Sequence, residues 1–315
     1  MTGARVLITC PQLQRTIDEH RGKLVANGIE IVLPTLVQQL SEIELMGLVP
    51  GVDGIIVGDD PLTAQVLGVA DRMRIISKWG VGIDNIDLDA AARIGIRVTN
   101  TPGMFGDEVA DVVVGYLILL ARHLHRVDEL LRSGSWPKIE GVSLAGRTLG
   151  IVGLGAIGQA VARRALVMGM DAIGSEISET NATAARKMGV RVMSLADLLP
   201  KVDVLSLNCP LTEANRHMID AASIEAMPRG VWIINTARGA LIDEAALIGG
   251  LASRQVGGAA LDVFEVEPLP LDSPLRGFDN VILGSHNSSN TAEAVRRTSR
   301  LAIQNLLHGL REVQR

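Results

Sequence analysis

The chain has 315 residues, of which 47% are apolar, and a formal net charge of −5. This length allows two ordinary domains with well-buried cores. A net negative charge without a long basic run argues against a nucleic-acid or anionic membrane surface. The most apolar window, VVVGYLILLA at 112–121, is too short to span a bilayer.

Two further features bear on location and metal content. The N-terminus lacks a signal-peptide pattern. The two cysteines, Cys10 and Cys209, are too few for a disulfide framework, and no Cys/His cluster has zinc spacing. We therefore expect a cytoplasmic protein with no metal, no nucleic acid and no membrane among its partners.

The first hundred residues alternate short apolar runs with helical stretches. The runs that predict strands are RVLIT (5–9), IEIVL (29–33), DGIIVG (53–58), MRIISK (73–78) and GIRVTN (95–100). Between them lie amphipathic segments such as LDAAARIG, which ends in a glycine suited to a helix C-cap. Strands that alternate with helices predict parallel βαβ units, and five of them form a small doubly wound layer.

A long helical segment is predicted from about 107 to 132, followed by a loop at 133–147. A second alternating series begins at TLGIVGLGAIG (148–158). Its further strands are predicted at DAIGSE (171–176), VRVMS (190–194), VDVLSLN (202–208), GVWIINT (230–236) and GGAALDV (257–263).

The last segment, 290–315, is amphipathic and helical. In two-part proteins of this kind such a helix can return to pack on the first domain. We therefore expect a discontinuous first domain, 1–99 with 288–315, into which a second domain, 100–287, is inserted. The crevice between two domains is the natural place for a ligand.

GLGAIG, from Gly153 to Gly158, is a G-x-G-x-x-G run that follows a predicted strand and opens a helix. Gly153 permits a tight turn, Gly155 lets a pyrophosphate approach the backbone, and Gly158 brings helix and strand together. The next strand delivers Glu176, whose carboxylate accepts both ribose hydroxyls of NAD but repels the 2′-phosphate of NADP. The sequence predicts NAD as the cofactor; the alternative is a glycine-rich turn without a ligand.

Three charged residues follow strand-like runs in the second half. Arg238 comes after VWII, Glu267 closes ALDVFEVE, and His286 comes after NVIL. The carboxyl ends of parallel strands line a ligand crevice, so the three can converge there. Beside a nicotinamide they form a set for 2-hydroxy acid chemistry: Arg238 would hold a carboxylate, His286 would exchange the hydroxyl proton, and Glu267 would orient the imidazole. Taken singly, each is more often an ion-paired or turn residue.

Six motifs, in order, resemble the NAD-dependent D-isomer-specific 2-hydroxyacid dehydrogenases, particularly the phosphoglycerate dehydrogenase branch. They are KWGVGIDNIDLDAAARIGIRVTNTP (78–102), TLGIVGLGAIG, LNCPLT (207–212), WIINTARGALIDEAAL (232–247), ALDVFEVEP (260–268) and NVILGSH (280–286). The resemblance covers nearly the whole chain. It implies an α/β protein of two doubly wound parallel-sheet domains: a flavodoxin-like substrate domain and an inserted Rossmann NAD-binding domain.

The resemblance also assigns residues. The family's catalytic Arg, Glu and His fall on Arg238, Glu267 and His286. The implied substrate contacts, besides Arg238, are Lys78 and the backbone N–H groups of Val81 and Gly82. The cofactor contacts that it implies are Val81, Ala156, Ile157, Glu176, Cys209, Pro210, Thr236, Ala237 and Asp262, the last for the nicotinamide carboxamide. Lys78 matches a basic position that can meet a substrate phosphate; the alternative is a solvated lysine at a strand end.

The chain departs from the family where substrate choice is concerned. Gly284-Ser285-His286-Asn287 stands where Thr-Pro-His-Ile is common, and Asp111 replaces a usual Glu. We expect an enzyme that interconverts a D-2-hydroxy acid and its 2-keto acid, with 3-phosphoglycerate as the first candidate and hydroxypyruvate or glyoxylate reduction as the next. The resemblance implies a homodimer formed through residues 107–143. The alternative class is an NAD-sensing corepressor that binds protein partners.

Overall fold

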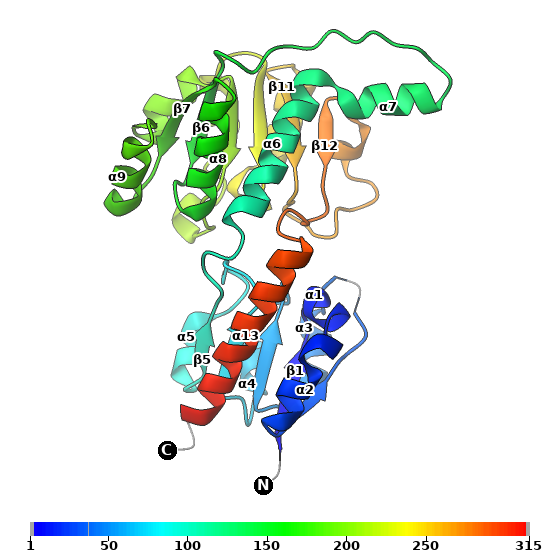
Figure 1. Ribbon diagram of the computed structural model, residues 1–315, viewed down its shortest axis with the longest axis vertical. Helices are drawn as coiled ribbons and strands as arrows, with labels where there is room; N and C mark the ends of the chain where they lie inside the picture. Colours follow the sequence, from blue (N-terminus) through cyan, green and yellow to red (C-terminus); the bar gives the residue numbers. More distant parts are fainter. Residues whose placement is uncertain (1–2, 37, 313–315) are drawn as a thin grey trace. The chain divides into compact units, whose positions relative to one another are not determined.

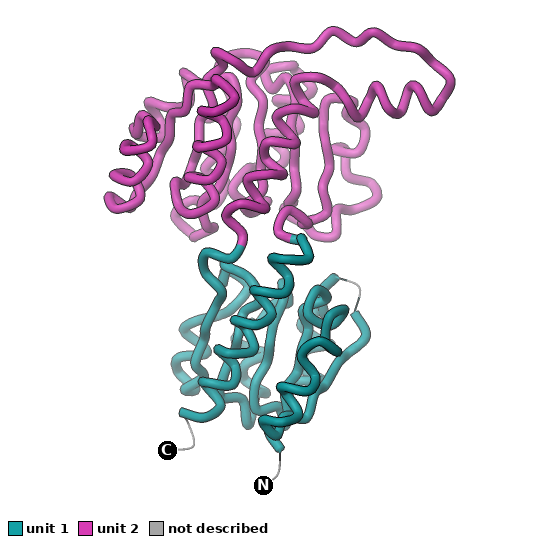
Figure 2. The backbone as a smooth tube through the Cα atoms, in the orientation of Figure 1, with its two compact units in different colours: residues 1–104, 290–315 teal, residues 105–289 magenta. Residues whose placement is uncertain are grey.

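The computed structural model describes residues 3–36 and 38–312. The chain divides into two compact units, which Figure 2 shows in different colours: unit 1 comprises 1–104 with 290–315, and unit 2 comprises 105–289. The divisions fall a few residues from the domain boundaries expected from the sequence. The assignment of substrate to the first domain and NAD to the second stays a prediction.

Unit 1 is built on a parallel sheet, five-stranded over the described residues, in the order β2-β1-β3-β4-β5. This is the flavodoxin-like order. Its strands are β1 (Ala4–Ile8), β2 (Ile29–Val32), β3 (Gly54–Val57), β4 (Ile75–Lys78) and β5 (Arg97–Thr99), and its helices are α1 (Pro11–Arg15), α2 (Asp18–Ala26), α3 (Glu42–Leu48), α4 (Ala64–Gly68), α5 (Leu88–Arg93) and α13 (Ala292–Glu312).

Every residue of the central strands β3 and β4 is buried, as expected where helices cover both faces of a parallel sheet. The last helix, α13, covers one of these faces and contacts both strands (Figure 1). Two hydrogen bonds attach it: Trp79 Nε1 donates to Ser299 Oγ at 3.0 Å, and Ser77 Oγ donates to the Ala302 carbonyl at 2.8 Å. Unit 1 is thus completed by a helix that follows unit 2 in the sequence.

Unit 2 carries the larger sheet, whose described strands run β12-β11-β10-β9-β6-β7-β8, all parallel. Read from β6, this order is that of a Rossmann fold with one added strand. The strands are β6 (Thr148–Val152), β7 (Asp171–Ser175), β8 (Arg191–Val192), β9 (Val204–Leu207), β10 (Val231–Asn235), β11 (Val256–Leu261) and β12 (Val281–Leu283). The helices are α6 (Gly106–Arg122), α7 (Leu124–Arg132), α8 (Ala156–Val167), α9 (Glu179–Lys187), α10 (Leu195–Leu198), α11 (Ala221–Ala226) and α12 (Glu244–Ala252), with short 3₁₀ helices η1 (Leu199–Lys201), η2 (Glu213–Asn215), η3 (Gly239–Leu241) and η4 (Pro274–Gly277).

The predicted fold class, two doubly wound parallel-sheet domains, is confirmed. One element was predicted wrongly: the single helix over 107–132 is two helices, α6 and α7. His123 separates them with a left-handed φ of 53°, which ends α6 because L-residues in this conformation cannot continue a right-handed helix. Among the described residues, no helix is both long and apolar enough to cross a membrane.

Candidate active site

The three predicted catalytic residues follow three adjacent strands of unit 2. Arg238, Glu267 and His286 come after β10, β11 and β12, which are neighbours in the sheet. Because the strands are parallel, all three residues lie beyond the same edge, the carboxyl edge. The sheet order therefore brings together residues that are up to 48 positions apart in the sequence.

Glu267 and His286 are in direct contact. Their Oε2 and Nδ1 atoms lie 2.7 Å apart, within hydrogen-bond distance, and both side chains are about one-fifth exposed. The other carboxylate oxygen, Oε1, accepts from the backbone N–H of Phe264 at 3.0 Å. Glu267 is therefore fixed by its own loop and fixes the imidazole in turn. Nδ1 is the ring nitrogen in this contact, and Nε2 lies on the other side of the ring.

Arg238 is held close to the same loop. Asn235 donates through Nδ2 to the Arg238 carbonyl at 2.8 Å, and Arg238 Nη1 donates to the Ala237 carbonyl at 2.8 Å. The next residue, Gly239, packs so closely on Phe264 that a Cβ atom there would lie 1.9 Å from the Phe264 carbonyl carbon. A larger residue at 239 would push apart the loops that carry Arg238 and Glu267.

The backbone at His286 is strained. Its φ of 54° lies in the left-handed region, which costs a non-glycine residue on the order of 1–3 kcal/mol and persists only where the surroundings enforce it. His286 donates its N–H to the Asp262 carbonyl at 2.7 Å. Asp262, predicted as a cofactor contact, is therefore hydrogen-bonded to the backbone of the histidine.

The glycine run forms the turn between β6 and α8. The strand order reverses at this point, between β6 and β9. Gly153 has a φ of 86°, and a Cβ atom there would meet the Cys209 backbone at 2.7 Å. A Cβ atom on Gly158 would lie 1.9 Å from the Gly153 carbonyl oxygen. At Gly155 the space is open, and no side chain caps the helix that starts at Ala156 and Ile157. The turn therefore presents uncapped N–H groups to an open region, as a phosphate site requires.

Two residues that come directly after β9 and β10 carry a buried polar side-chain atom. Asn208 Oδ1 and Thr236 Oγ1 have no hydrogen-bond partner within the part of the chain that the structure describes. They follow the paired ends of β9 and β10. Unsatisfied buried polar atoms are costly, so they indicate a missing partner such as a ligand. Thr236 was predicted as a cofactor contact, whereas Asn208 was not; its signal in the sequence is only its place at the end of a strand.

The remaining predicted cofactor contacts surround the turn. Glu176 accepts from the N–H groups of Leu154 and Ser178 at 2.7 and 2.8 Å, so its carboxylate is fixed at the end of β7. Burial raises the pKa of the Cys209 thiol to about 11, so it is not a nucleophile at neutral pH. The Pro210 carbonyl accepts from Asn215, and the Ala237 N–H donates to Asn235 Oδ1.

The predicted substrate contacts of unit 1 differ in exposure. Val81 is exposed, and Gly82 is partly exposed. Lys78 is only 1% exposed; its ammonium group donates to the Gly58 carbonyl and lies 2.9 Å from Asp59 Oδ1. It is therefore not a solvated lysine at a strand end, and its charge already has a partner.

Comparison with known proteins identifies the family. The family model described as D-isomer specific 2-hydroxyacid dehydrogenase, NAD binding domain, matches residues 114–288. The hydroxypyruvate reductase of Thermotoga maritima is 39% identical over 89% of this chain and 92% of its own length. The D-3-phosphoglycerate dehydrogenase of Methanocaldococcus jannaschii is 36% identical over 98% of this chain and 57% of its own length. A D-lactate dehydrogenase from Aquifex aeolicus, solved with NAD and lactic acid, has a TM-score of 0.83 at 27% identity, covering 95% of this chain and 93% of that one.

The chain thus belongs to the D-isomer-specific 2-hydroxyacid dehydrogenases, and it is an NAD-dependent oxidoreductase. The resemblance and the cofactor predicted from the sequence are both confirmed.

The place of Glu176 leads to a prediction about cofactor choice. A 2′-phosphate beside this fixed carboxylate would meet a like charge; at about 4 Å and an effective dielectric near 20 this costs roughly 4 kcal/mol before relaxation. We expect the protein to bind NADH at least tenfold more tightly than NADPH, measured by the quenching of protein fluorescence. Glu176→Gln should reduce the difference in affinity between NADH and NADPH. Tighter binding of NADPH to the wild-type protein would contradict the role of Glu176.

Proposed function

We propose that the protein reduces small unphosphorylated 2-keto acids, such as hydroxypyruvate or glyoxylate, to 2-hydroxy acids of the D series. Arg238, Glu267 and His286 are the proposed catalytic residues. The observation that carries the reaction type is the 2.7 Å contact between Glu267 and His286 at the edge that also carries Arg238.

The cofactor would occupy the turn between β6 and α8. The uncapped N–H groups at Ala156 and Ile157 suit a pyrophosphate, and Glu176 suits the ribose hydroxyls. The unpartnered Asn208 and Thr236 atoms suit polar groups of a ligand at the next strand ends. When bound as NADH, the cofactor supplies the hydride.

Three residues of the protein would bind the substrate and transfer the proton. Arg238 carries five N–H donors in a planar fork, which can grip the substrate carboxylate and polarise the carbonyl oxygen. His286 in its protonated form delivers a proton from Nε2 to that oxygen as the carbonyl carbon is reduced. Glu267 stabilises the imidazolium before transfer and holds Nδ1 throughout. In the oxidation direction the neutral His286 takes the proton back.

The substrate proposal rests on Lys78. A lysine that binds a substrate phosphate must present its ammonium group to that phosphate, but this one is buried and paired with Asp59. The named reductase relative, which matches over nearly its whole length, points the same way. 3-Phosphoglycerate is the second candidate, because a 3-phosphoglycerate dehydrogenase matches 98% of this chain.

A comparison of keto acids tests this order. NADH oxidation should be fast with hydroxypyruvate or glyoxylate and slower with 3-phosphohydroxypyruvate. Lys78→Met should change all three catalytic efficiencies by the same factor, because the side chain supports the fold. Asp59→Asn is the matched variant: it leaves the buried ammonium group without this carboxylate, so it should lower Tm more than Lys78→Met does. A loss of activity confined to the phosphorylated acid would instead make Lys78 a phosphate contact.

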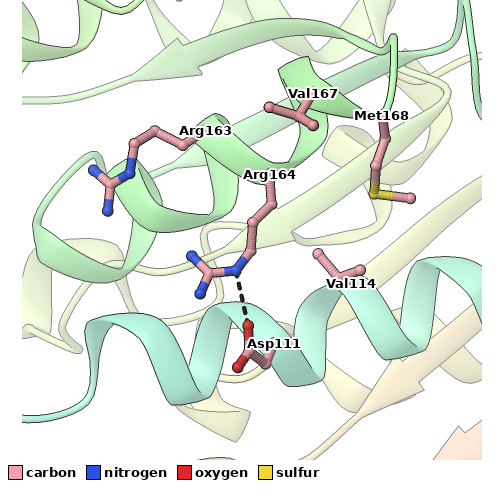
Figure 3. A pocket seen from close by; sticks show the side chains of 6 residues that line it. All are labelled: Asp111, Val114, Arg163, Arg164, Val167 and Met168. Atoms are coloured by element: carbon pink, nitrogen blue, oxygen red, sulfur yellow. Dashed lines mark hydrogen bonds and ion pairs between the residues drawn. The ribbon is translucent and has the colours of Figure 1, made fainter.

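We also propose that the protein is a cytoplasmic homodimer. Segment 124–142 carries exposed apolar side chains, including Leu124, Leu131 and Trp136, which is 82% exposed. A groove of about 430 Å³ between α6 and α8 adds Val114, Val167 and Met168, beside the Arg164–Asp111 ion pair (Figure 3). Exposed apolar surface of this kind favours a partner. Sedimentation velocity tests the dimer, which a purely monomeric protein would contradict.

A further inference from the structure

Asn235 is the last residue of β10, and its side chain binds the turn that carries Arg238. Its Oδ1 atom accepts from the Ala237 N–H at 3.0 Å, and its Nδ2 atom donates to the Arg238 carbonyl at 2.8 Å. A single amide therefore fixes the peptide group that precedes Ala237 and the one that follows Arg238. Asn235 is only 1% exposed, so solvent does not compete for either hydrogen bond.

The backbone of Asn235 is fixed by the sheet. Asn235 is paired with Leu207 of β9 on one side and with Leu261 of β11 on the other. A residue in the middle of a parallel sheet, hydrogen-bonded to two neighbouring strands, is among the least mobile parts of a domain. The Asn235 side chain thus connects a rigid strand to the turn at 236–238.

The side chain of Arg238 depends on this turn. Its Nη1 atom donates to the Ala237 carbonyl at 2.8 Å. That carbonyl belongs to the peptide group between the two that Asn235 fixes, so the direction in which it points is restricted from both sides. The Arg238 carbonyl also accepts from the Leu241 N–H at 3.3 Å, at the start of η3. The guanidinium is therefore bound to an acceptor whose orientation depends on Asn235.

The two partners of Asn235 require an amide. The Ala237 N–H can only donate and the Arg238 carbonyl can only accept, so the side chain must offer an acceptor and a donor at once. Asparagine carries both on one planar group. An ionised aspartate would carry two acceptors and place an oxygen against the Arg238 carbonyl, and leucine, of similar size, would leave both backbone groups without this partner.

We propose that Asn235 is a positioning residue that sets the direction of the Arg238 guanidinium, and with it the grip on the substrate carboxylate. It acts through the backbone of the turn, since its side chain bonds to backbone atoms of Ala237 and Arg238. The inference rests on the proposed role of Arg238 in keto-acid reduction. It extends the site to a buried residue behind the one that would hold the substrate.

Asn235→Leu removes both hydrogen bonds. It should lower kcat/KM for hydroxypyruvate about tenfold or more and raise KM, because the guanidinium no longer points in one direction. Asn280→Leu is the matched control: Asn280 Nδ2 donates to the Gly257 carbonyl at 3.0 Å, at the opposite edge of the same sheet. This variant should lower Tm and keep the kcat/KM of wild type. An unchanged kcat/KM in Asn235→Leu would overturn the inference.

A double-mutant cycle separates positioning from general damage. If Asn235 acts through the guanidinium, Asn235→Leu should cost less than about twofold when Arg238 is already replaced by Lys, because effects of residues that act through one another are not additive. A loss that persists in full in the Arg238→Lys background would overturn the inference and leave the role of Arg238 intact. Asn235→Asp keeps the acceptor for the Ala237 N–H but not the donor, and the same cycle applies to it if Asn235→Leu does not fold.

A second measurement does not depend on turnover. Phenylglyoxal modifies arginine side chains, and mass spectrometry of the peptides gives the rate at Arg238 and at Arg254, whose side chain is 61% exposed. In Asn235→Leu the rate at Arg238 should rise about threefold or more as its restraint is lost, with no change at Arg254. An unchanged rate at Arg238, or an equal rise at both, would overturn the inference. Failure of the wild-type protein to reduce any 2-keto acid would by itself overturn only the proposed function.

Discussion

Arg238→Lys should lower kcat/KM for keto-acid reduction by about 2–4 kcal/mol in transition-state terms. Lysine keeps the positive charge but loses the planar fork that holds a carboxylate at two points. The hydrogen bond from the Asn235 side-chain amide to the carbonyl of residue 238 does not use the side chain of residue 238, so it should survive the change and the loop should be retained. Steady-state kinetics should show both a higher KM for the keto acid and a lower kcat.

Arg254→Lys provides the control for this substitution. Arg254 lies in the same unit, outside the proposed site, and pairs with Asp279 across 3.8 Å at the surface. Such an exposed pair contributes little, so this variant should keep wild-type kinetics. If Arg238→Lys also kept them, Arg238 would have no part in the reaction.

Glu267→Gln should move the falling limb of the reduction profile to lower pH. Reduction requires the protonated imidazole, so activity is present at low pH and is lost as pH rises through the pKa of His286. A carboxylate 2.7 Å from Nδ1 favours the charged imidazolium over the neutral ring, and this preference is what the substitution tests. Gln keeps the shape and a hydrogen bond but not the charge. Oxidation, which needs neutral His286, should therefore begin at lower pH in this variant.

Glu265→Gln is a closely matched control. Glu265 lies two residues earlier in the same loop and pairs with a different histidine, His217, at 2.6 Å. Removing its charge should leave the limb in place, whereas His286→Ala should abolish the limb and most of the activity. The measurement is the pH dependence of kcat/KM in both directions. Superimposed profiles for wild type and Glu267→Gln would show that Glu267 does not affect the protonation of His286.

Much of the fold was predictable because it is encoded locally. Each predicted strand is an apolar run bounded by turn residues, and the sequence placed all of them to within a few residues. The contact between Glu267 and His286 was foreseeable for a related reason: both follow strands of one parallel sheet, so sheet order alone brings them near each other. The order of β11 and β12 was the only long-range information needed.

The features that escaped prediction depend on packing between distant segments. The break at His123 is a single backbone angle inside an otherwise uninterrupted helical pattern. The burial of Lys78 depends on the loop at 58–59, and charge alone suggests a solvated residue. The Tyr116 hydroxyl comes close to Gly284 because α6 packs on β11, which no local pattern around Tyr116 reveals.

The way α13 completes unit 1 determines when that unit can form during synthesis. Trp79 and its partner Ser299 are separated by 220 residues, so the ribosome makes β4 long before the helix that covers it. Unit 2 is one continuous stretch, 105–289, and is complete while the covering helix is still being translated. The sheet that is made first is thus covered last, because the helix that packs on β3 and β4 is synthesised only after the whole of unit 2.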